Sequence, residues 1–71
     1  MRTVQIVKIG DKYAVRRRYN IFAWKYLDTI SDNWWTTEES IKKYCLTNYN
    51  TAILLYSNTI VFKNIEVIAE E

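Results

Sequence analysis

The sequence predicts a small α+β domain that combines an antiparallel sheet with a packed helix. Residues 3–28 alternate strand-like segments with turn residues, and residues 36–46 carry the signals of a capped helix. The chain has 71 residues, of which 49% are hydrophobic and 15% aromatic, so ring side chains supply much of the area that a short chain must bury. We therefore expect residues 1–71 to form a single domain.

The first half of the chain is expected to form a three-stranded meander. Its segments are rich in β-branched and aromatic residues, and Gly10 allows the positive φ of a tight hairpin. Because apolar residues of segment 3–9 fall on both faces, this strand is expected in a central position rather than at an edge. The predicted strands cover residues 3–9, 12–18 and 22–28, with turns at Gly10-Asp11 and Tyr19-Asn20.

Strand alternation divides the side chains of the second and third predicted strands between two faces. Arg16 and Arg18 share one face with Ala14, while Arg17 points toward the side of Tyr13. The third strand presents a one-sided aromatic ladder, which in so small a domain is more often core than a stacking platform. The ladder consists of Phe22, Trp24 and Tyr26, and the opposite face carries Ala23, Lys25 and Leu27.

Residues 37–46 are predicted to form a helix that packs on the sheet. Thr36 and Glu39 have the spacing of a capping box, and Lys42 and Lys43 lie near the C-terminal end, where cations complement the helix dipole. The i,i+4 pairs Glu38–Lys42 and Glu39–Lys43 add support, and the face expected to meet the sheet carries Ile41, Tyr44 and Cys45.

The segment 50–63 has no clean period, so two structures remain open for the C-terminal part of the chain. The preferred interpretation is a short second helix at about 51–59, with Asn50 as a candidate N-cap, followed by a strand at 64–69 that adds to the sheet. The alternative is a β-hairpin that pairs 52–57 with 60–68 and turns at Ser57-Asn58.

The charges of the chain are unevenly placed. Residues 1–35 carry seven Lys and Arg against three Asp, whereas residues 36–71 carry three Lys against five Glu, which leaves a net charge of +2. The basic character therefore belongs to the first half, although an excess of this size is small for a dedicated nucleic-acid module.

Arginine and tryptophan side chains of the first half form the candidate partner-binding surface. Adjacent residues of an extended segment point in opposite directions, so one of Trp34 and Trp35 is expected in the core and the other at an interface. The alternative explanation of the arginines is a charge cluster that protects a sheet edge. The candidate contact residues are Arg16, Arg17, Arg18, Trp24, Lys25, Trp34 and Trp35.

A non-enzymatic module that binds an acidic protein partner and inhibits or modulates it is the preferred functional interpretation. Nucleic-acid binding is the first alternative, because arginine suits phosphates and aromatic rings suit exposed bases. A structural homo-oligomer that buries the spare aromatic surface is the second.

Catalysis, cofactor binding and metal binding are not expected. The chain has no histidine, so the usual zinc ligand sets cannot be assembled, and no glycine-rich phosphate loop is present. Turn formation and helix capping explain the carboxylates, and the single Cys45 fits a buried hydrophobic role in a reduced, cytoplasmic setting. No apolar run is long enough for a membrane span. The carboxylates considered are Asp28, Asp32, Glu38 and Glu39.

The succession KYAVRRR, FAWKYLD and WW, followed by a capped helix ending in KKYC, resembles the small, mostly uncharacterised accessory proteins of tailed bacteriophages. The resemblance covers residues 12–46 and is one of general texture, without a defined catalytic motif. It implies an accessory or host-directed factor that acts in the host cytoplasm by binding and inhibiting a host enzyme, a defence complex or a nucleic acid. It assigns a role to no residue.

Overall fold

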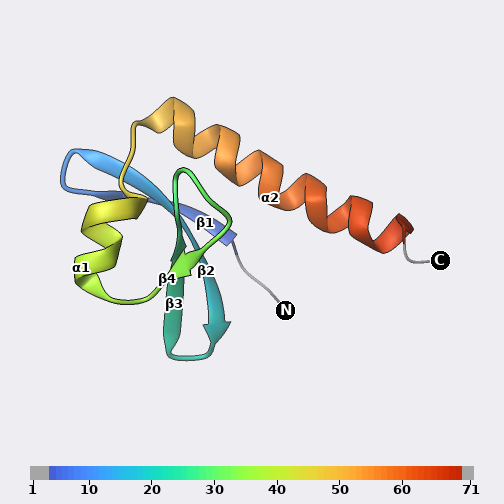
Figure 1. Ribbon diagram of the computed structural model, residues 1–71, viewed down its shortest axis with the longest axis horizontal. Coiled ribbons are helices and arrows are strands. Elements are labelled where there is room, and N and C mark those ends of the chain that lie inside the picture. The colour runs from blue at the N-terminus through green and yellow to red at the C-terminus, as the bar shows by residue number, and fades with distance from the viewer. Residues whose placement is uncertain (1–3, 70–71) are drawn as a thin grey trace.

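The computed structural model describes the backbone of residues 4–69 and the side chains of residues 4–60. A four-stranded antiparallel sheet is followed by two helical segments, which confirms the predicted α+β class (Figure 1). The strands are β1 (Val4–Ile9), β2 (Lys12–Asn20), β3 (Ala23–Leu27) and β4 (Trp34–Trp35). The helical segments are α1 (Glu38–Ser40), the π-helical turn η1 (Ile41–Cys45) that continues it, and α2 (Tyr49–Ala69).

The meander of the first three strands is confirmed. β1 and β2 pair without interruption from Val4↔Arg17 to Ile9↔Lys12, and Gly10 takes a φ of 65° in the two-residue turn between them. The second turn lies at 21–22 rather than at Tyr19-Asn20, because β2 runs on to Asn20 through an irregularity after Arg18. Each hairpin brings consecutive strands side by side.

β1 lies at the edge of the sheet, so the expected central position is wrong for the single chain. The strand order is β1-β2-β3-β4, and β1 pairs with β2 alone among the described residues. In a meander each strand pairs with the next, so the first strand becomes central only if a later segment returns to it. No later strand does so in the part of the chain that the structure describes.

The predicted strand at 64–69 is wrong, and so is the alternative hairpin, because α2 is one continuous helix from Tyr49 to Ala69. The fourth strand of the sheet is instead β4, which pairs with β3 through Tyr26↔Trp35 and Leu27↔Trp34. The helix begins two residues before the expected 51–59. Its N-cap is Asn48 rather than Asn50, since Asn48 Oδ1 accepts a hydrogen bond of 2.8 Å from the N–H of Thr51.

Helix propensity explains why α2 continues through its β-branched residues. Those residues disfavour a helix by only a few tenths of a kcal/mol each, roughly 0.5 on average, and the segment contains neither Gly nor Pro. Once the capped first turn has formed, each following residue adds one backbone hydrogen bond, so the helix extends along the segment. Among the residues described, no helix is both long and apolar enough to cross a membrane.

The predicted helix at 37–46 is confirmed in position. Its N-cap differs from the predicted residue, and the segment is not α-helical throughout. The cap is Thr37 rather than Thr36, and its hydroxyl accepts a hydrogen bond of 3.3 Å from the N–H of Ser40. The three α-helical residues pass directly into the π-helical turn. The predicted Glu38–Lys42 pair forms at 3.3 Å with both side chains exposed, so its contribution to stability is small.

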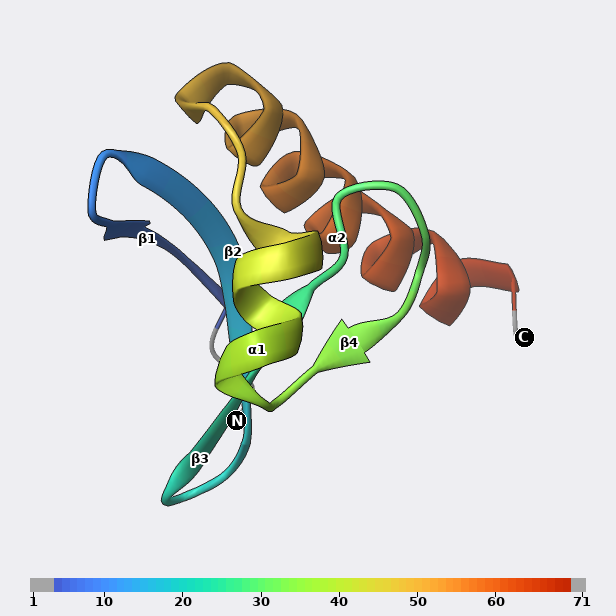
Figure 2. The same ribbon diagram turned by 60° about the vertical axis from the view of Figure 1, so that its left-hand side comes forward.

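Helical segments cover both faces of the sheet. On one face, α2 buries Val15 and Leu27 against Ala52. On the other, the α1–η1 segment buries Cys45, whose Sγ donates a 3.5 Å hydrogen bond to the carbonyl of Tyr26. Figure 2 shows the end of the β2–β3 hairpin projecting from the body, away from α2. The partly buried residues around the α2 core are Val4, Ile6, Tyr13, Trp34, Leu55 and Tyr56.

Candidate partner-binding site

The sheet divides the candidate contact residues between its two faces. Arg16 pairs with Tyr26 and Arg18 with Trp24, so these side chains share the face covered by α1 and η1. Arg17 pairs with Lys25 and faces the α2 side, as strand alternation predicts. The residues therefore form a two-sided hairpin rather than one flat basic surface. Trp35 belongs to the first face, and Trp34 to the second.

Trp24 lies under two arginines of the neighbouring strand. The guanidinium carbon of Arg16 is 3.9 Å from the centroid of the Trp24 ring, and that of Arg18 is 4.8 Å from it. Arg16 also donates hydrogen bonds to Gln5 Oε1 at 3.0 Å and to the Tyr26 hydroxyl at 3.2 Å. Cation–π contact and these hydrogen bonds hold the Arg16 side chain in one arrangement.

A second arginine–tryptophan contact lies on the opposite face. The guanidinium carbon of Arg17 is 4.5 Å from the centroid of the Trp34 ring, which itself packs against the α2 core. Nearby, Lys25 Nζ is 5.5 Å from the ring centroid of Tyr19. An aromatic ring thus lies beside each of four hairpin cations, Arg16, Arg17, Arg18 and Lys25.

Both tryptophans of β4 are half-buried and have partners within the chain. Trp34 packs against the core beneath α2. Trp35 stacks on Tyr44 with ring centroids 4.9 Å apart and an interplanar angle of 19°, and its Nε1 donates a 3.0 Å hydrogen bond to Asp28 Oδ2. The two rings point to opposite faces of the sheet, as predicted. Each ring contacts other residues of the chain, so neither is fully exposed.

Asp28 organises the loop that carries β4 into place. Its side chain is buried, and its Oδ1 accepts hydrogen bonds from the N–H groups of Ile30 and Ser31 at 2.8 and 3.2 Å. The bond from Ile30 and then that from Trp35 hold the pKa of Asp28 below its ordinary value of 3.8, against the opposing effect of burial. This explains the carboxylate as a turn-former, the role that the sequence indicated.

The tip of the β2–β3 hairpin is the most exposed apolar segment of the site. Ile21 is 74% exposed and Phe22 89% exposed, and Tyr19 beside them is half exposed. The sequence placed Phe22 in a strand-borne ladder with Trp24, but the structure places it in the turn, where its N–H donates a 2.8 Å hydrogen bond to Asn20 Oδ1. Hydrophobicity alone could not identify these contact candidates, because a buried strand would have the same composition.

The cations of this hairpin are not interleaved with carboxylates in the sequence. Residues 12–27 contain five Lys and Arg and no Asp or Glu. Between residues 4 and 60, the ion pair that the structure contains is Glu38–Lys42, on α1 and η1. Arg16, Arg17, Arg18 and Lys25 are therefore able to form ion pairs with groups outside the chain.

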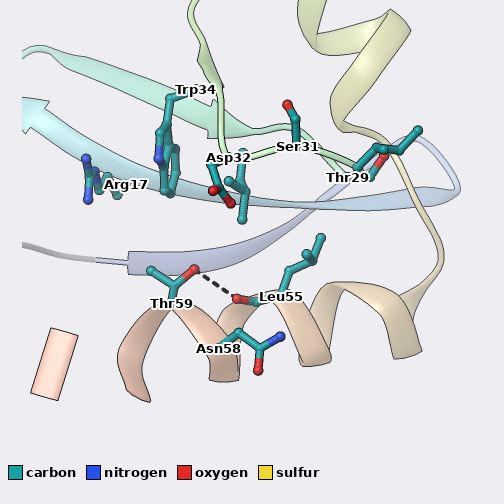
Figure 3. Close-up of a pocket in the computed structure, with 10 residues that line it drawn as sticks. Arg17, Thr29, Ser31, Asp32, Trp34, Leu55, Asn58 and Thr59 are labelled. Atoms are coloured by element: carbon teal, nitrogen blue, oxygen red, sulfur yellow. Dashed lines mark hydrogen bonds between the residues drawn. The ribbon is translucent and has the colours of Figure 1, made fainter. Parts of the chain in front are cut away.

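Two hollows flank the hairpin, one on each face of the sheet. The first has a volume of about 490 Å³ and lies between α2 and the loop before β4 (Figure 3). The second, of about 420 Å³, lies between the sheet and the α1–η1 segment. Every buried side-chain polar atom of the described residues has a hydrogen-bond partner, so neither hollow contains a buried polar atom that lacks one.

The lining of the hollows is mixed. The first hollow is lined by Arg17, Leu27, Thr29, Ile30, Ser31, Asp32, Trp34, Leu55, Asn58 and Thr59. The second is lined by Ile9, Trp24, Tyr26, Thr36, Glu38, Ile41, Lys42 and Leu46. In the first, Thr59 Oγ1 donates a 2.9 Å hydrogen bond to the Leu55 carbonyl, so its hydroxyl is already engaged (Figure 3).

Cys45 is not placed for nucleophilic chemistry. The side chain is fully buried, and burial together with the nearby Asp28 charge raises its pKa to about 11. A thiol of this kind is almost entirely protonated near neutral pH. Within the described part of the chain, no group of three or more His, Cys, Asp or Glu side chains could hold a metal ion.

The fold and this surface define a small α+β domain with an antiparallel sheet and a projecting, two-sided basic hairpin. The chain matches no protein-family model, and neither a curated protein nor a solved structure is significantly similar to it.

Proposed function

We propose that this protein is a non-enzymatic binding module whose β2–β3 hairpin docks on an acidic protein surface and modulates that partner. One observation carries the proposal: the β2–β3 hairpin carries the cations Arg16, Arg17, Arg18 and Lys25, has no carboxylate over residues 12–27, and ends in an exposed Ile21-Phe22 tip. Interfaces of this composition place an apolar anchor at the centre and charged groups around it.

The arginines are suited to such an interface because they are ordered before binding. Arg16 is fixed by Trp24, Gln5 and Tyr26, so it loses little rotamer freedom when a carboxylate approaches. A guanidinium has five N–H donors, and Arg16 uses two groups, Nε and Nη1, within the chain. The remaining donors are available to an acidic partner.

The exposed tip supports a protein partner more than a nucleic acid. Ile21 has no ring for stacking on a base, and its burial requires an apolar recess of the kind that proteins offer. Each isolated apolar side chain that moves into such a recess contributes about 1.5–3 kcal/mol. The net charge of +2 is also modest for a phosphate-binding protein.

Nucleic-acid binding is the second candidate, and one observation favours it. A two-stranded β-ribbon with cations on both faces can enter the major groove of duplex DNA, and the end of the β2–β3 hairpin, beyond the pairing of β1 with Arg17, has this form. The split of Arg16 and Arg18 from Arg17, however, leaves only part of the basic surface for a single-stranded backbone.

The resemblance to phage accessory proteins suggests a host protein or a defence complex as the partner, encountered in the host cytoplasm. The free thiol of Cys45 fits a reducing compartment, because a buried reduced cysteine needs no disulfide partner there.

The test is affinity capture from a bacterial host lysate with the wild-type chain and an Arg16→Glu/Arg18→Glu variant in parallel. We expect a protein with an acidic surface to be captured by the wild type and lost with the variant. The matched control is Lys43→Glu, compared with the single variant Arg18→Glu, because it changes the charge by the same amount on η1 at a residue that lines neither hollow. Equal loss in both variants would contradict a role for the hairpin.

The second arm of the test measures fluorescence anisotropy with short single- and double-stranded DNA and RNA at low and near-physiological salt. A nucleic-acid function predicts binding whose log affinity falls steeply with log salt and disappears in Arg16→Glu/Arg18→Glu. We expect no sequence-independent binding at near-physiological salt. Tight binding there would favour the second candidate over the first.

A further inference from the structure

β1 carries the side-chain pattern of a central strand although it lies at the edge of the sheet. Val4 and Ile6 pack against the core on the α2 side, while Val7 and Ile9 point to the other face. Edge strands are usually blunted by charge, proline or a bulge. β1 contains a single charged residue, Lys8, and its register with β2 is unbroken, which means that it has no bulge. This edge is therefore poorly protected against pairing with a further strand.

The hydrogen bonds of Tyr13 show which backbone groups of β1 face outward. Tyr13 lies opposite Lys8, yet its N–H and C=O both bond to Thr47, at 2.7 and 2.8 Å. Lys8 and Tyr13 therefore form a non-hydrogen-bonded pair, and the backbone groups of Lys8 point away from β2. Because such pairs alternate along an antiparallel ladder, the backbone groups of Ile6 and Val4 also point outward.

We propose that β1 pairs antiparallel with β1 of a second copy of this chain, about a two-fold axis that passes beside Ile6. In this register Ile6 lies opposite Ile6 of the second copy, and Val4 lies opposite Lys8. All three outward-facing residues of each copy then form hydrogen-bonded pairs. Lys8 meets no like charge, and the two four-stranded sheets become one.

The flank of α2 that turns toward β1 supports this arrangement. Leu55, Asn58 and Thr59 line the hollow on the β4 side of α2, so the opposite flank of the helix lies on the β1 side. That flank is an i, i+4, i+7, i+11 stripe, and its Ile53 and Ile60 are 36% and 37% exposed. The stripe consists of Tyr49, Ile53, Tyr56 and Ile60.

A second copy satisfies more of this surface than a foreign strand does. A two-fold axis perpendicular to the sheet keeps both copies of α2 on the same face, so their apolar stripes approach each other across the joined edge. An isologous interface requires such a self-complementary surface. A foreign strand would satisfy the outward backbone groups of β1 but would leave the stripe on α2 uncovered.

The first experiment is sedimentation equilibrium of the full chain over protein concentrations up to about 100 µM, which detects micromolar self-association. We expect a particle of twice the 8.6 kDa chain mass. A monomer over the whole range would overturn the proposal, whatever the capture experiment on the hairpin shows, because the two surfaces share no residue.

The second experiment identifies the edge with a matched pair of substitutions at Lys8. Lys8→Pro removes an outward N–H without breaking a β1–β2 hydrogen bond, so it should shift the protein to monomer. Lys8→Thr keeps that N–H and should leave the dimer intact. Circular dichroism confirms that each variant is folded. A folded Lys8→Pro variant that remains fully dimeric would contradict pairing through β1.

A disulfide test reports the register directly. Cα atoms of a hydrogen-bonded antiparallel pair are about 5.5 Å apart, within the range of about 4.4–6.8 Å that a disulfide spans. Ile6→Cys should therefore give a cross-linked dimer on mild oxidation. Lys8→Cys is the control, because the two Lys8 positions would lie about 13 Å apart along the strands. Cross-linking through position 8 but not position 6 would exclude this register.

Discussion

The guanidinium of Arg16 on β2 lies 3.9 Å from the centroid of the Trp24 ring on β3. The same guanidinium donates hydrogen bonds to Gln5 on β1 and to Tyr26 on β3. One side chain thereby joins three strands on one face of the sheet. The contact serves two purposes, because it stabilises the sheet and also orders a cation that can meet a partner.

The first prediction concerns the strength of the Arg16–Trp24 contact. In a double-mutant cycle of Arg16→Ala and Trp24→Leu, we expect a coupling energy of about 0.5–1 kcal/mol, typical of a partly exposed cation–π pair. Urea denaturation of the four proteins measures it. The control cycle uses Lys12→Ala with Trp24→Leu and should be additive within about 0.5 kcal/mol. Equal coupling in both cycles would contradict a specific contact.

The second prediction separates binding from stability at the hairpin tip. The Ile21→Ser/Phe22→Ser variant should change the free energy of unfolding by less than about 0.5 kcal/mol, because both side chains are exposed. Its affinity for a captured protein partner should fall by about tenfold or more, since two apolar anchors are lost.

The control for the tip is Ile30→Ser, which removes an apolar side chain that is 95% exposed in the loop before β4. Capture should be unchanged by this substitution. If Ile30→Ser weakens capture as much as the tip variant, general surface hydrophobicity rather than the hairpin governs binding.

The third prediction is a pH dependence of stability from Asp28. Its pKa in the folded protein is lowered by the hydrogen bonds from Ile30 and Trp35, so around its ordinary pKa of 3.8 the unfolded chain binds more protons than the native one. Stability from this group is complete above that value and is lost as the pH falls through the folded pKa.

Urea unfolding of the wild type and Asp28→Asn from about pH 6 to pH 2.5 tests this dependence, the window in which a lowered aspartate titrates. The wild type should be more stable than the variant at pH 6, and the difference should shrink toward pH 2.5. A difference that stays constant across this range would show that the ionised state of Asp28 contributes nothing.

The fourth prediction concerns the reactivity of Cys45. Burial raises its pKa to about 11, so the native thiol should resist a disulfide reagent at pH 8 and react only as fast as the protein opens. In guanidinium chloride one thiol per chain should react at once. The same shift implies that stability from this group is full below the unfolded pKa and falls as the pH rises toward 11. Rapid labelling of the folded protein would contradict its burial.

The fifth prediction distinguishes two asparagines at the start of α2. Asn48→Ala should destabilise the protein by about 1 kcal/mol, because the Asn48 side chain caps the N–H of Thr51. Asn50→Ala should change stability by less than about 0.5 kcal/mol, because Asn50 lies inside the helix and is exposed. Thermal unfolding of the two variants measures the difference. Equal effects would contradict the assigned cap.

Strand alternation predicts the faces of the arginines in the candidate site. It does not predict which residues lie in the exposed turn at the tip of the hairpin. Alternation along a strand predicts that Arg17 faces away from Arg16 and Arg18, and the structure agrees. Phe22 was placed by the same rule, but β3 begins one residue later, at Ala23, so Phe22 lies in the turn. A shift of one residue at a turn decides whether an aromatic side chain is inside or outside.

The sequence by itself determined the meander, the position of the first helical segment, the face of each arginine and the turn-forming role of Asp28. These features depend on residues close together in the chain, where spacing and hydrogen-bonding groups leave few arrangements. Only the tertiary structure decided that β1 is an edge strand, that Trp34–Trp35 forms the fourth strand and that residues 64–69 are helical. Those outcomes depend on which distant segments bury one another, and the same apolar composition permits several answers until the whole core is assembled.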